Sequence, residues 1–113
     1  MDSTDEDRLF LSAVTLAELH RGVQRLPDGG RRRRLHAWLS GDLTERLRGR
    51  ILPVEERVAE AWGLIASERE ATGRPISAID VFLAATARVH HLTVATRNLA
   101  DFPGTVPAVD PLS

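Results

Sequence analysis

Three acidic residues stand where predicted strands meet helices and loops. Glu18 lies in the first turns of the helix that leaves the apolar segment 9–14, and Asp101 follows the strand expected at 92–96. Asp80 begins a helix whose end feeds that same strand through a short turn, so this helix must run antiparallel to it. In open parallel sheets, functional groups gather at the carboxyl ends of the strands. We therefore predict that the three carboxylates converge at one edge of a sheet.

Carboxylates held together repel one another, which raises their pKa values unless a cation lies between them. The chain has no cysteine, and its four histidines show no metal-binding spacing. An all-oxygen ligand set favours a hard ion such as Mg²⁺ or Mn²⁺ over Zn²⁺. Such an ion lowers the pKa of a bound water and neutralises charge on a phosphodiester during in-line displacement. The expected chemistry is metal-assisted hydrolysis.

Each of these acids also has a purely structural explanation. Glu18 could pair with Arg21 or support the start of its helix electrostatically. Asp80 could belong to an imperfect capping box. Asp101 and Asn98 are residue types common in turns and caps. The hypothesis of a site therefore depends on all of them meeting at one place.

Short apolar segments alternate with longer helical patterns along the chain. Strands are predicted at 9–14, 51–54, 92–96 and 106–109, and helical patterns at 16–26, 31–47, 55–72 and 78–91. Pro107 removes a ladder donor, so the last strand suits a sheet edge. The alternation predicts an α/β fold with a mostly parallel sheet.

Particular residues define the ends and faces of the helices. Ser77 is a suitable N-cap for the helix 78–91, which is apolar nearly all round and is expected to pack inside the domain. Trp38 and Trp62 lie on apolar faces and are expected to pack there rather than stack on bases. The arginine run 31–34 could contact RNA phosphates or an acidic partner segment, or it could be the solvated first turn of a helix.

The bulk composition is that of an ordinary globular protein. With 113 residues, we expect an acidic tail at 1–8 followed by a single domain at 9–113. No apolar run is long enough for a membrane span, and the acidic N-terminus does not resemble an export signal. The absence of cysteine fits a reducing cytoplasm. A net charge of −1 argues against gripping nucleic acid by bulk charge but leaves room for a local basic patch.

Three segments, 11–22, 73–80 with 84–87, and 96–102, resemble in order the second, third and fourth motifs of PIN-domain ribonuclease toxins of the VapC type, from type II toxin–antitoxin systems. The resemblance implies a PIN-like three-layer α/β/α fold and an endoribonuclease dependent on Mg²⁺ or Mn²⁺. It assigns Glu18, Asp80 and Asp101 as catalytic and metal-binding acids, with Thr96 and Asn98 in support. It also implies an RNA substrate, a homodimer and a cognate antitoxin.

The chain departs from this family at its N-terminus. The family begins with a central strand ending in an Asp-Thr-Asn-like motif, whose Asp is the principal metal ligand, and this strand is missing here. Its loss removes about five buried side chains at about 1.5–3 kcal/mol each, which rivals a domain's stability of about 5–15 kcal/mol. We expect an isolated chain that is marginally stable or completed by another polypeptide, and that is weakly active or inactive. The alternative is an inactive truncated PIN domain that still binds an antitoxin or a second protomer.

Overall fold

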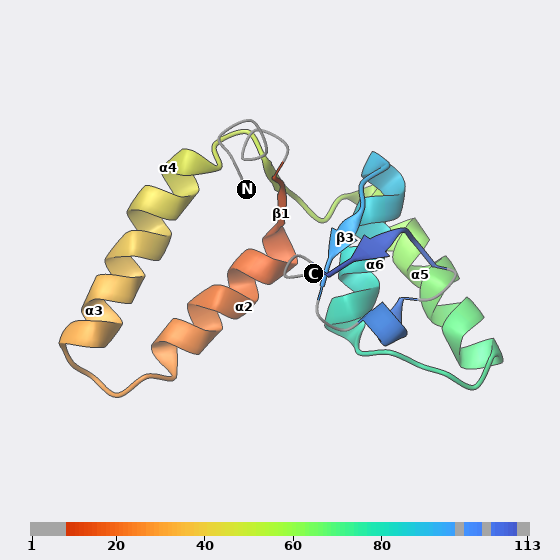
Figure 1. Ribbon diagram of the computed structural model, residues 1–113, viewed down its shortest axis with the longest axis horizontal. Helices are drawn as coiled ribbons and strands as arrows, with labels where there is room; N and C mark the ends of the chain where they lie inside the picture. The colour runs from red at the N-terminus through yellow and green to blue at the C-terminus, as the bar shows by residue number, and fades with distance from the viewer. Residues whose placement is uncertain (1–8, 97–98, 103–104, 111–113) are drawn as a thin grey trace. The chain divides into compact units, whose positions relative to one another are not determined.

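The computed structural model describes residues 9–96, 99–102 and 105–110 (Figure 1). The chain divides into two compact units, Met1–Pro53 and Val54–Ser113, which are described in turn. The acidic tail expected at 1–8 lies outside the described residues. The expectation of one domain over 9–113 stays a prediction.

The first unit is a helical hairpin rooted in a short parallel strand pair (Figure 1). Strand β1 pairs with β2, so that Leu11 lies opposite Ile51 and Ser12 opposite Leu52. Between these two strands the chain forms the two helical legs of the hairpin: α2 is the first leg, and α3, η1 and α4 form the second. The elements are β1 (Leu11–Ser12), α2 (Ala13–Gln24), α3 (Gly30–Ala37), the π-helix η1 (Trp38–Leu43), α4 (Thr44–Arg46) and β2 (Ile51–Leu52).

Helix α2 begins earlier than the sequence pattern indicates. The Ser12 hydroxyl oxygen accepts a hydrogen bond from the Val14 backbone N–H at 3.1 Å, which caps the helix and draws Ala13 and Val14 out of the predicted strand. Of the apolar residues on this helix, Val23 is buried, whereas Leu19 is 40% exposed. The hairpin therefore leaves apolar surface uncovered within its own unit.

The second leg contains a π-helical segment within the helix predicted at 31–47. The Thr44 hydroxyl donates to the carbonyl oxygen of Leu39, five residues earlier, at 2.8 Å across this segment. Leu39 and Leu47 are buried. The prediction for Trp38 is wrong, because its side chain is 45% exposed. Gly49 follows the helix with φ +80°, a conformation that favours glycine.

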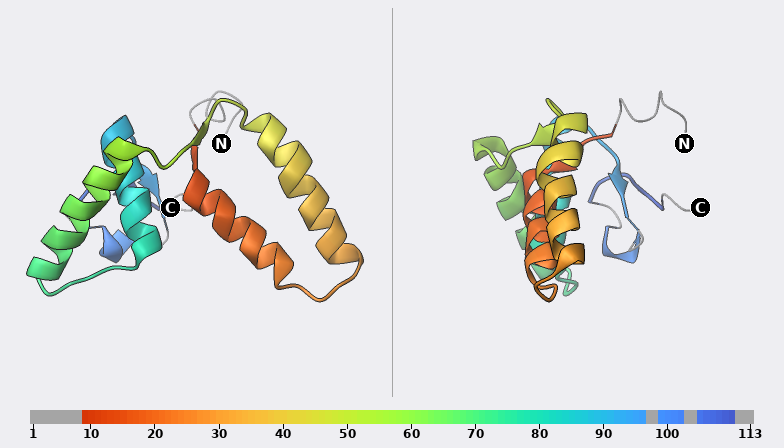
Figure 2. Two further views of the ribbon diagram at one scale, coloured as in Figure 1. Left: turned by 180° about the vertical axis from the view of Figure 1, so that it is seen from behind. Right: turned by 90° about the vertical axis from the view of Figure 1, so that its left-hand side faces the viewer.

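The second unit contains the hydrophobic core and a second parallel strand pair, visible from behind in Figure 2. Strand β3 pairs with β4 in parallel, with Val94 opposite Ala108, in agreement with the mostly parallel sheet expected from the sequence. Helices α5 and α6 pack against each other. The elements are α5 (Glu56–Ala71), α6 (Ala78–His90), β3 (Val94–Ala95), the 3₁₀ helix η2 (Leu99–Asp101) and β4 (Ala108–Val109).

The core lies between α5 and α6. Val58, Ala61 and Ile65 of α5 are buried, whereas Ala59 is exposed. Trp62 packs as predicted: its ring lies 5.6 Å from that of Phe82, and its indole N–H donates to the Ala78 carbonyl at 3.3 Å. The aromatic pair joins the two helices near the start of α6.

Helix α6 matches its prediction closely. The Ser77 hydroxyl caps it by accepting from the Asp80 N–H at 3.2 Å, and buried residues line the helix as the apolar pattern indicated. It ends at His91, which adopts a left-handed conformation with φ 56°. In the part of the chain that the structure describes, no helix is long and apolar enough to cross a membrane. The α/β class with parallel strands is confirmed.

Candidate active site

Asp80 lies in the first turn of α6, at the third position after the N-cap residue Ser77. Its backbone N–H is held by the Ser77 hydroxyl, so the cap fixes the backbone that carries the carboxylate. Both explanations weighed from the sequence apply here, because the same Asp80 takes part in the cap and also faces another acid. The structural role does not exclude the functional one.

Partial burial raises the pKa of the Asp80 carboxyl above its ordinary value of 3.8. The Ser77 hydroxyl acts in the opposite direction and lowers this pKa. The Asp101 carboxylate raises it, both by its charge and by a hydrogen bond that the protonated Asp80 shares with it. The structure therefore brings Asp80 and Asp101 together, although they are 21 residues apart in sequence.

Asp101 is the last residue of η2, and the core anchors its loop. The next residue, Phe102, is only 1% exposed and belongs to the core cluster. The Thr105 hydroxyl donates to the Phe102 carbonyl at 2.8 Å, and the Arg88 guanidinium of α6 donates to the Thr105 carbonyl at 2.9 Å. The buried Phe102 side chain thus anchors Asp101 to the core, and the Arg88 contact ties Thr105 to α6.

The two predicted supporting residues follow β3. Thr96 is half-buried, and its N–H donates to the Val109 carbonyl at 2.9 Å, which extends the β3–β4 pairing by one bond. Its place at the carboxyl end of β3 agrees with the position argued from the sequence. Asn98 lies outside the described residues.

Glu18 belongs to the first unit, in the middle of α2, and is described with that unit. Its side chain is 44% exposed and lies 3.8 Å from the Arg21 guanidinium, one helical turn further on. This is the pairing named above as its structural explanation. Exposed pairs of this kind contribute about 0.3–0.5 kcal/mol, so the contact leaves the carboxylate available to other partners.

Two carboxylates on different elements are a suitable start for a hard-cation site. Asp80 and Asp101 offer only oxygen ligands, and their mutual repulsion is the cost that a divalent cation would remove. No group of three or more acidic, histidine or cysteine side chains forms a metal-binding cluster among the described residues. The pair is therefore the nucleus of a candidate site, to which Glu18 remains a predicted third contributor.

Sequence reasoning missed Arg69, which lies on the buried face of α5. It is only 9% exposed, and its Nε atom has no hydrogen-bond partner among the described residues. Together with Trp62, Pro75 and Ile76 it lines a cavity of about 210 Å³. The signal was present in the sequence, because residue 69 continues the stripe formed by residues 58, 61 and 65.

Two curated relatives resemble most of this chain. Toxin FitB of Neisseria gonorrhoeae is 41% identical over 102 residues, which cover 90% of this chain and 73% of the relative. VapC ribonuclease Y4jK of Sinorhizobium fredii is 33% identical over the same shares of the two chains. The aligned region includes the segments that carry the acidic residues.

The fold agrees with a solved structure as well. The crystal structure of FitAcB from Neisseria gonorrhoeae superposes with a TM-score of 0.89 at 39% identity, covering 95% of this chain and 78% of the other. The pattern of the PIN domain family matches residues 2–103. Sequence motifs, parallel strands and these matches agree, and the chain belongs to the PIN domain family.

Proposed function

We propose that this chain is an endoribonuclease of the VapC toxin type that depends on Mg²⁺ or Mn²⁺. The observation that carries the proposal is the pairing of the Asp80 and Asp101 carboxylates, one on a capped helix and one on a loop anchored by Phe102. Two relatives support the class of activity, since one is named a toxin and the other a VapC ribonuclease.

The chain's own residues have separable tasks in this mechanism. Ser77 positions Asp80 through the cap and favours its ionised form, which is the form that binds a cation. Asp101 contributes the second carboxylate, and Glu18 is the proposed third. When bound there, a hard divalent cation supplies Lewis acidity toward the phosphodiester and toward a water. Thr96 and Asn98 are proposed to support the site from the end of β3.

The test is RNA cleavage by the full chain with Mg²⁺ and with chelator. Asp80→Asn and Asp101→Asn each keep the side-chain size and remove a charge. We expect each to reduce cleavage by more than about 100-fold, since losing even an outer contact of a metal ligand costs about 10–100-fold. Glu60→Gln is the matched control, because Glu60 is an exposed acid of α5. Cleavage that survives chelation, or equal losses in all three variants, would refute the proposal.

A second candidate is a catalytically inactive chain that retains binding to an antitoxin or a second protomer. Exposed apolar residues of the first unit favour it, among them Phe10, Leu19 and Trp38. The same assay separates the two, because this candidate predicts no metal-dependent cleavage together with a stable complex. For either candidate we propose a cognate antitoxin as partner, a homodimeric assembly and a cytoplasmic location.

A further inference from the structure

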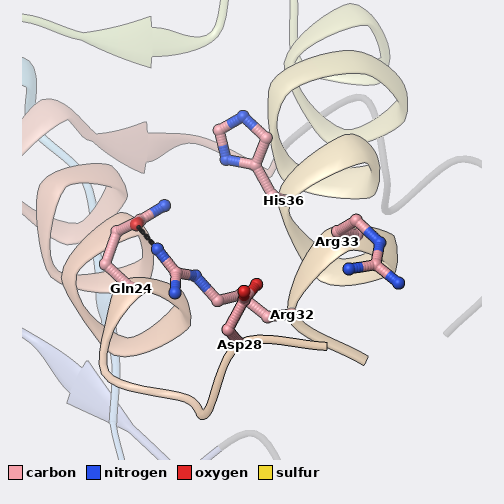
Figure 3. A pocket seen from close by; sticks show the side chains of 5 residues that line it. All are labelled: Gln24, Asp28, Arg32, Arg33 and His36. Atoms are coloured by element: carbon pink, nitrogen blue, oxygen red, sulfur yellow. Dashed lines mark hydrogen bonds between the residues drawn. The ribbon is translucent and has the colours of Figure 1, made fainter. Parts of the chain in front are cut away.

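A second polar site lies in the first unit, between the two legs of the helical hairpin. A cavity of about 310 Å³ is lined by Gln24 of α2, Asp28 of the connecting loop, and Arg32, Arg33 and His36 of α3. Figure 3 shows these five side chains. This volume is at the lower end of the range for ligand pockets, about 300–1,000 Å³. The cavity contains none of the acidic residues assigned to the proposed active site.

The geometry of α3 selects which arginines reach this cavity. Residues three and four apart share a helix face, so Arg32 and Arg33 each lie beside His36, and all three line the cavity although Arg32 and Arg33 extend in different directions (Figure 3). Figure 3 shows Arg32 extending toward α2, where its guanidinium donates to the Gln24 side-chain oxygen at 2.7 Å. Arg31 and Arg34 belong to the same run but do not line the cavity. The run is therefore divided into two arginines that line the cavity and two that do not.

Charge in this part of the chain favours an anionic ligand. Residues 9–53 contain nine arginines and four acidic residues, a net charge of +5, although the whole chain carries −1. Arg33 forms no ion pair among the described residues, and no acidic side chain lies in the first turn of α3 to offset the run. The net charge of the whole chain therefore conceals an excess of positively charged side chains in this hairpin.

The remaining lining residues distinguish between anionic ligands. Asp28 offers only acceptor oxygens, so it disfavours a bare phosphate or an acidic peptide. Gln24 offers a donor and an acceptor, and His36 offers an aromatic ring, whose centroid lies 6.3 Å from that of His20 in an edge-to-face arrangement. Proteins recognise unpaired RNA bases by hydrogen bonds to their edges and by stacking on histidine rings or guanidinium planes. The cavity lining offers hydrogen-bond donors, acceptors and an aromatic ring, and this combination fits the base of a nucleotide.

We propose that this cavity binds one unpaired nucleotide of single-stranded RNA. The base lies against Gln24, Asp28 and the His36 ring. Arg32, which Gln24 holds in place, and Arg33, at the outer side of the cavity, bind the phosphates on either side of this base. This site rests on the proposed ribonuclease function and adds to it a binding element remote in sequence from Asp80 and Asp101.

The test measures binding separately from cleavage. Full-length chain carrying Asp80→Asn keeps the RNA intact, and fluorescence anisotropy with a labelled 12-nucleotide single-stranded RNA gives the dissociation constant at physiological salt. At this salt the Debye length is about 8 Å, so remote charges contribute little. We expect Arg32→Gln with Arg33→Gln to weaken binding by about 10- to 100-fold. The matched control, Arg31→Gln with Arg34→Gln, removes the same charge from the same helix and is expected to weaken it less than about 3-fold.

The Asp28→Asn variant tests for a base rather than a phosphate alone. If a base is bound, this change alters the order of affinities among RNAs that differ in one base. If only phosphate is bound, removing the Asp28 carboxylate increases the affinity for every RNA by the same factor. That result overturns the proposal. Equal losses in the two arginine pairs overturn it as well, as does loss of antitoxin binding with unchanged RNA affinity. Circular dichroism melts of each variant show that folding is retained.

The outcomes for this site and for the proposed function differ. Selective RNA binding through Arg32 and Arg33, in a chain whose parent form does not cleave RNA, supports the nucleotide site and refutes the nuclease. Metal-dependent cleavage with no difference between the two arginine pairs supports the nuclease and refutes the site.

Discussion

Ser77 links the stability of α6 to the ionisation of Asp80, so Ser77→Ala should alter both. The substitution removes the oxygen that accepts the Asp80 N–H at 3.2 Å. Loss of a serine N-cap costs about 1 kcal/mol, which for a chain of this size lowers the melting temperature by about 3–6 °C. Urea unfolding followed by circular dichroism measures this loss.

The electrostatic part of the effect has a defined pH dependence. Asp80 has a folded pKa above its unfolded value of 3.8, so its contribution to stability is fully present below pH 3.8 and is lost as pH rises through the folded pKa. Ser77 lowers that pKa, and its removal raises it further. Ser77→Ala should therefore be more destabilising at pH 7 than at pH 3.5, and carboxyl ¹³C NMR should show Asp80 titrating at higher pH.

Ser12→Ala is the matched control, because Ser12 caps α2 in the same way by accepting the Val14 N–H at 3.1 Å. It should cost a similar cap energy without changing the difference between pH 3.5 and pH 7. Ser77→Thr keeps a hydroxyl and should restore the parent behaviour. If Ser12→Ala and Ser77→Ala show the same pH dependence, the coupling between the cap and Asp80 is refuted.

Three further predictions concern the core, a helix end and the metal. Ile65→Ala, at a fully buried position, should cost about 2–5 kcal/mol in urea unfolding, whereas Leu64→Ala, 61% exposed, should change stability by less than about 0.5 kcal/mol. His91→Gly should stabilise the chain by about 1 kcal/mol, because φ at this residue is 56° and glycine adopts it without strain; an unchanged melting temperature would contradict this. Asp80→Asn should raise the melting temperature in metal-free buffer at pH 7 and abolish the stabilisation by Mg²⁺ expected of the parent chain, and a Mg²⁺ shift retained by the variant would count against Asp80 as a ligand.

The sequence predicts the helices well where local chemistry defines their ends. Gly73 terminates α5 with a positive φ and Ser77 begins α6 as its N-cap, and both features follow from residue type alone. The strands are two residues each, shorter than every predicted range. Apolar β-branched segments indicate a strand but do not show where a cap such as Ser12 turns the chain into a helix.

Burial is harder to predict than secondary structure because it depends on what covers a face. Trp38 has the periodicity of a core residue, yet nothing in its unit covers it. Arg69 shows the converse, since its charge argues for exposure while its place on the α5 stripe buries it. For Arg69 the periodicity gives the right environment and the residue type misleads, whereas for Trp38 both periodicity and residue type indicate burial that the unit does not provide.

Sequence topology predicts one part of the candidate site directly. Asp80 and Asp101 meet because α6 must run antiparallel to β3, an argument that needs only the short turn at His91. Glu18 depends instead on how a separate unit is placed, which no local pattern determines, and in its own unit it pairs with Arg21. The order of elements thus predicts which acidic side chains meet within one unit. It does not predict which side chains of different units meet.

The distribution of charge connects the two proposed sites. Residues 54–113 contain eight acidic residues and five arginines, a net of −3, whereas residues 9–53 carry +5. An acidic pair such as Asp80 and Asp101 repels an RNA backbone unless a cation offsets it, so it cannot by itself supply affinity for the substrate. A basic hairpin supplies that affinity without a metal. Binding of RNA should therefore persist in chelator and weaken with salt, while cleavage requires the divalent ion.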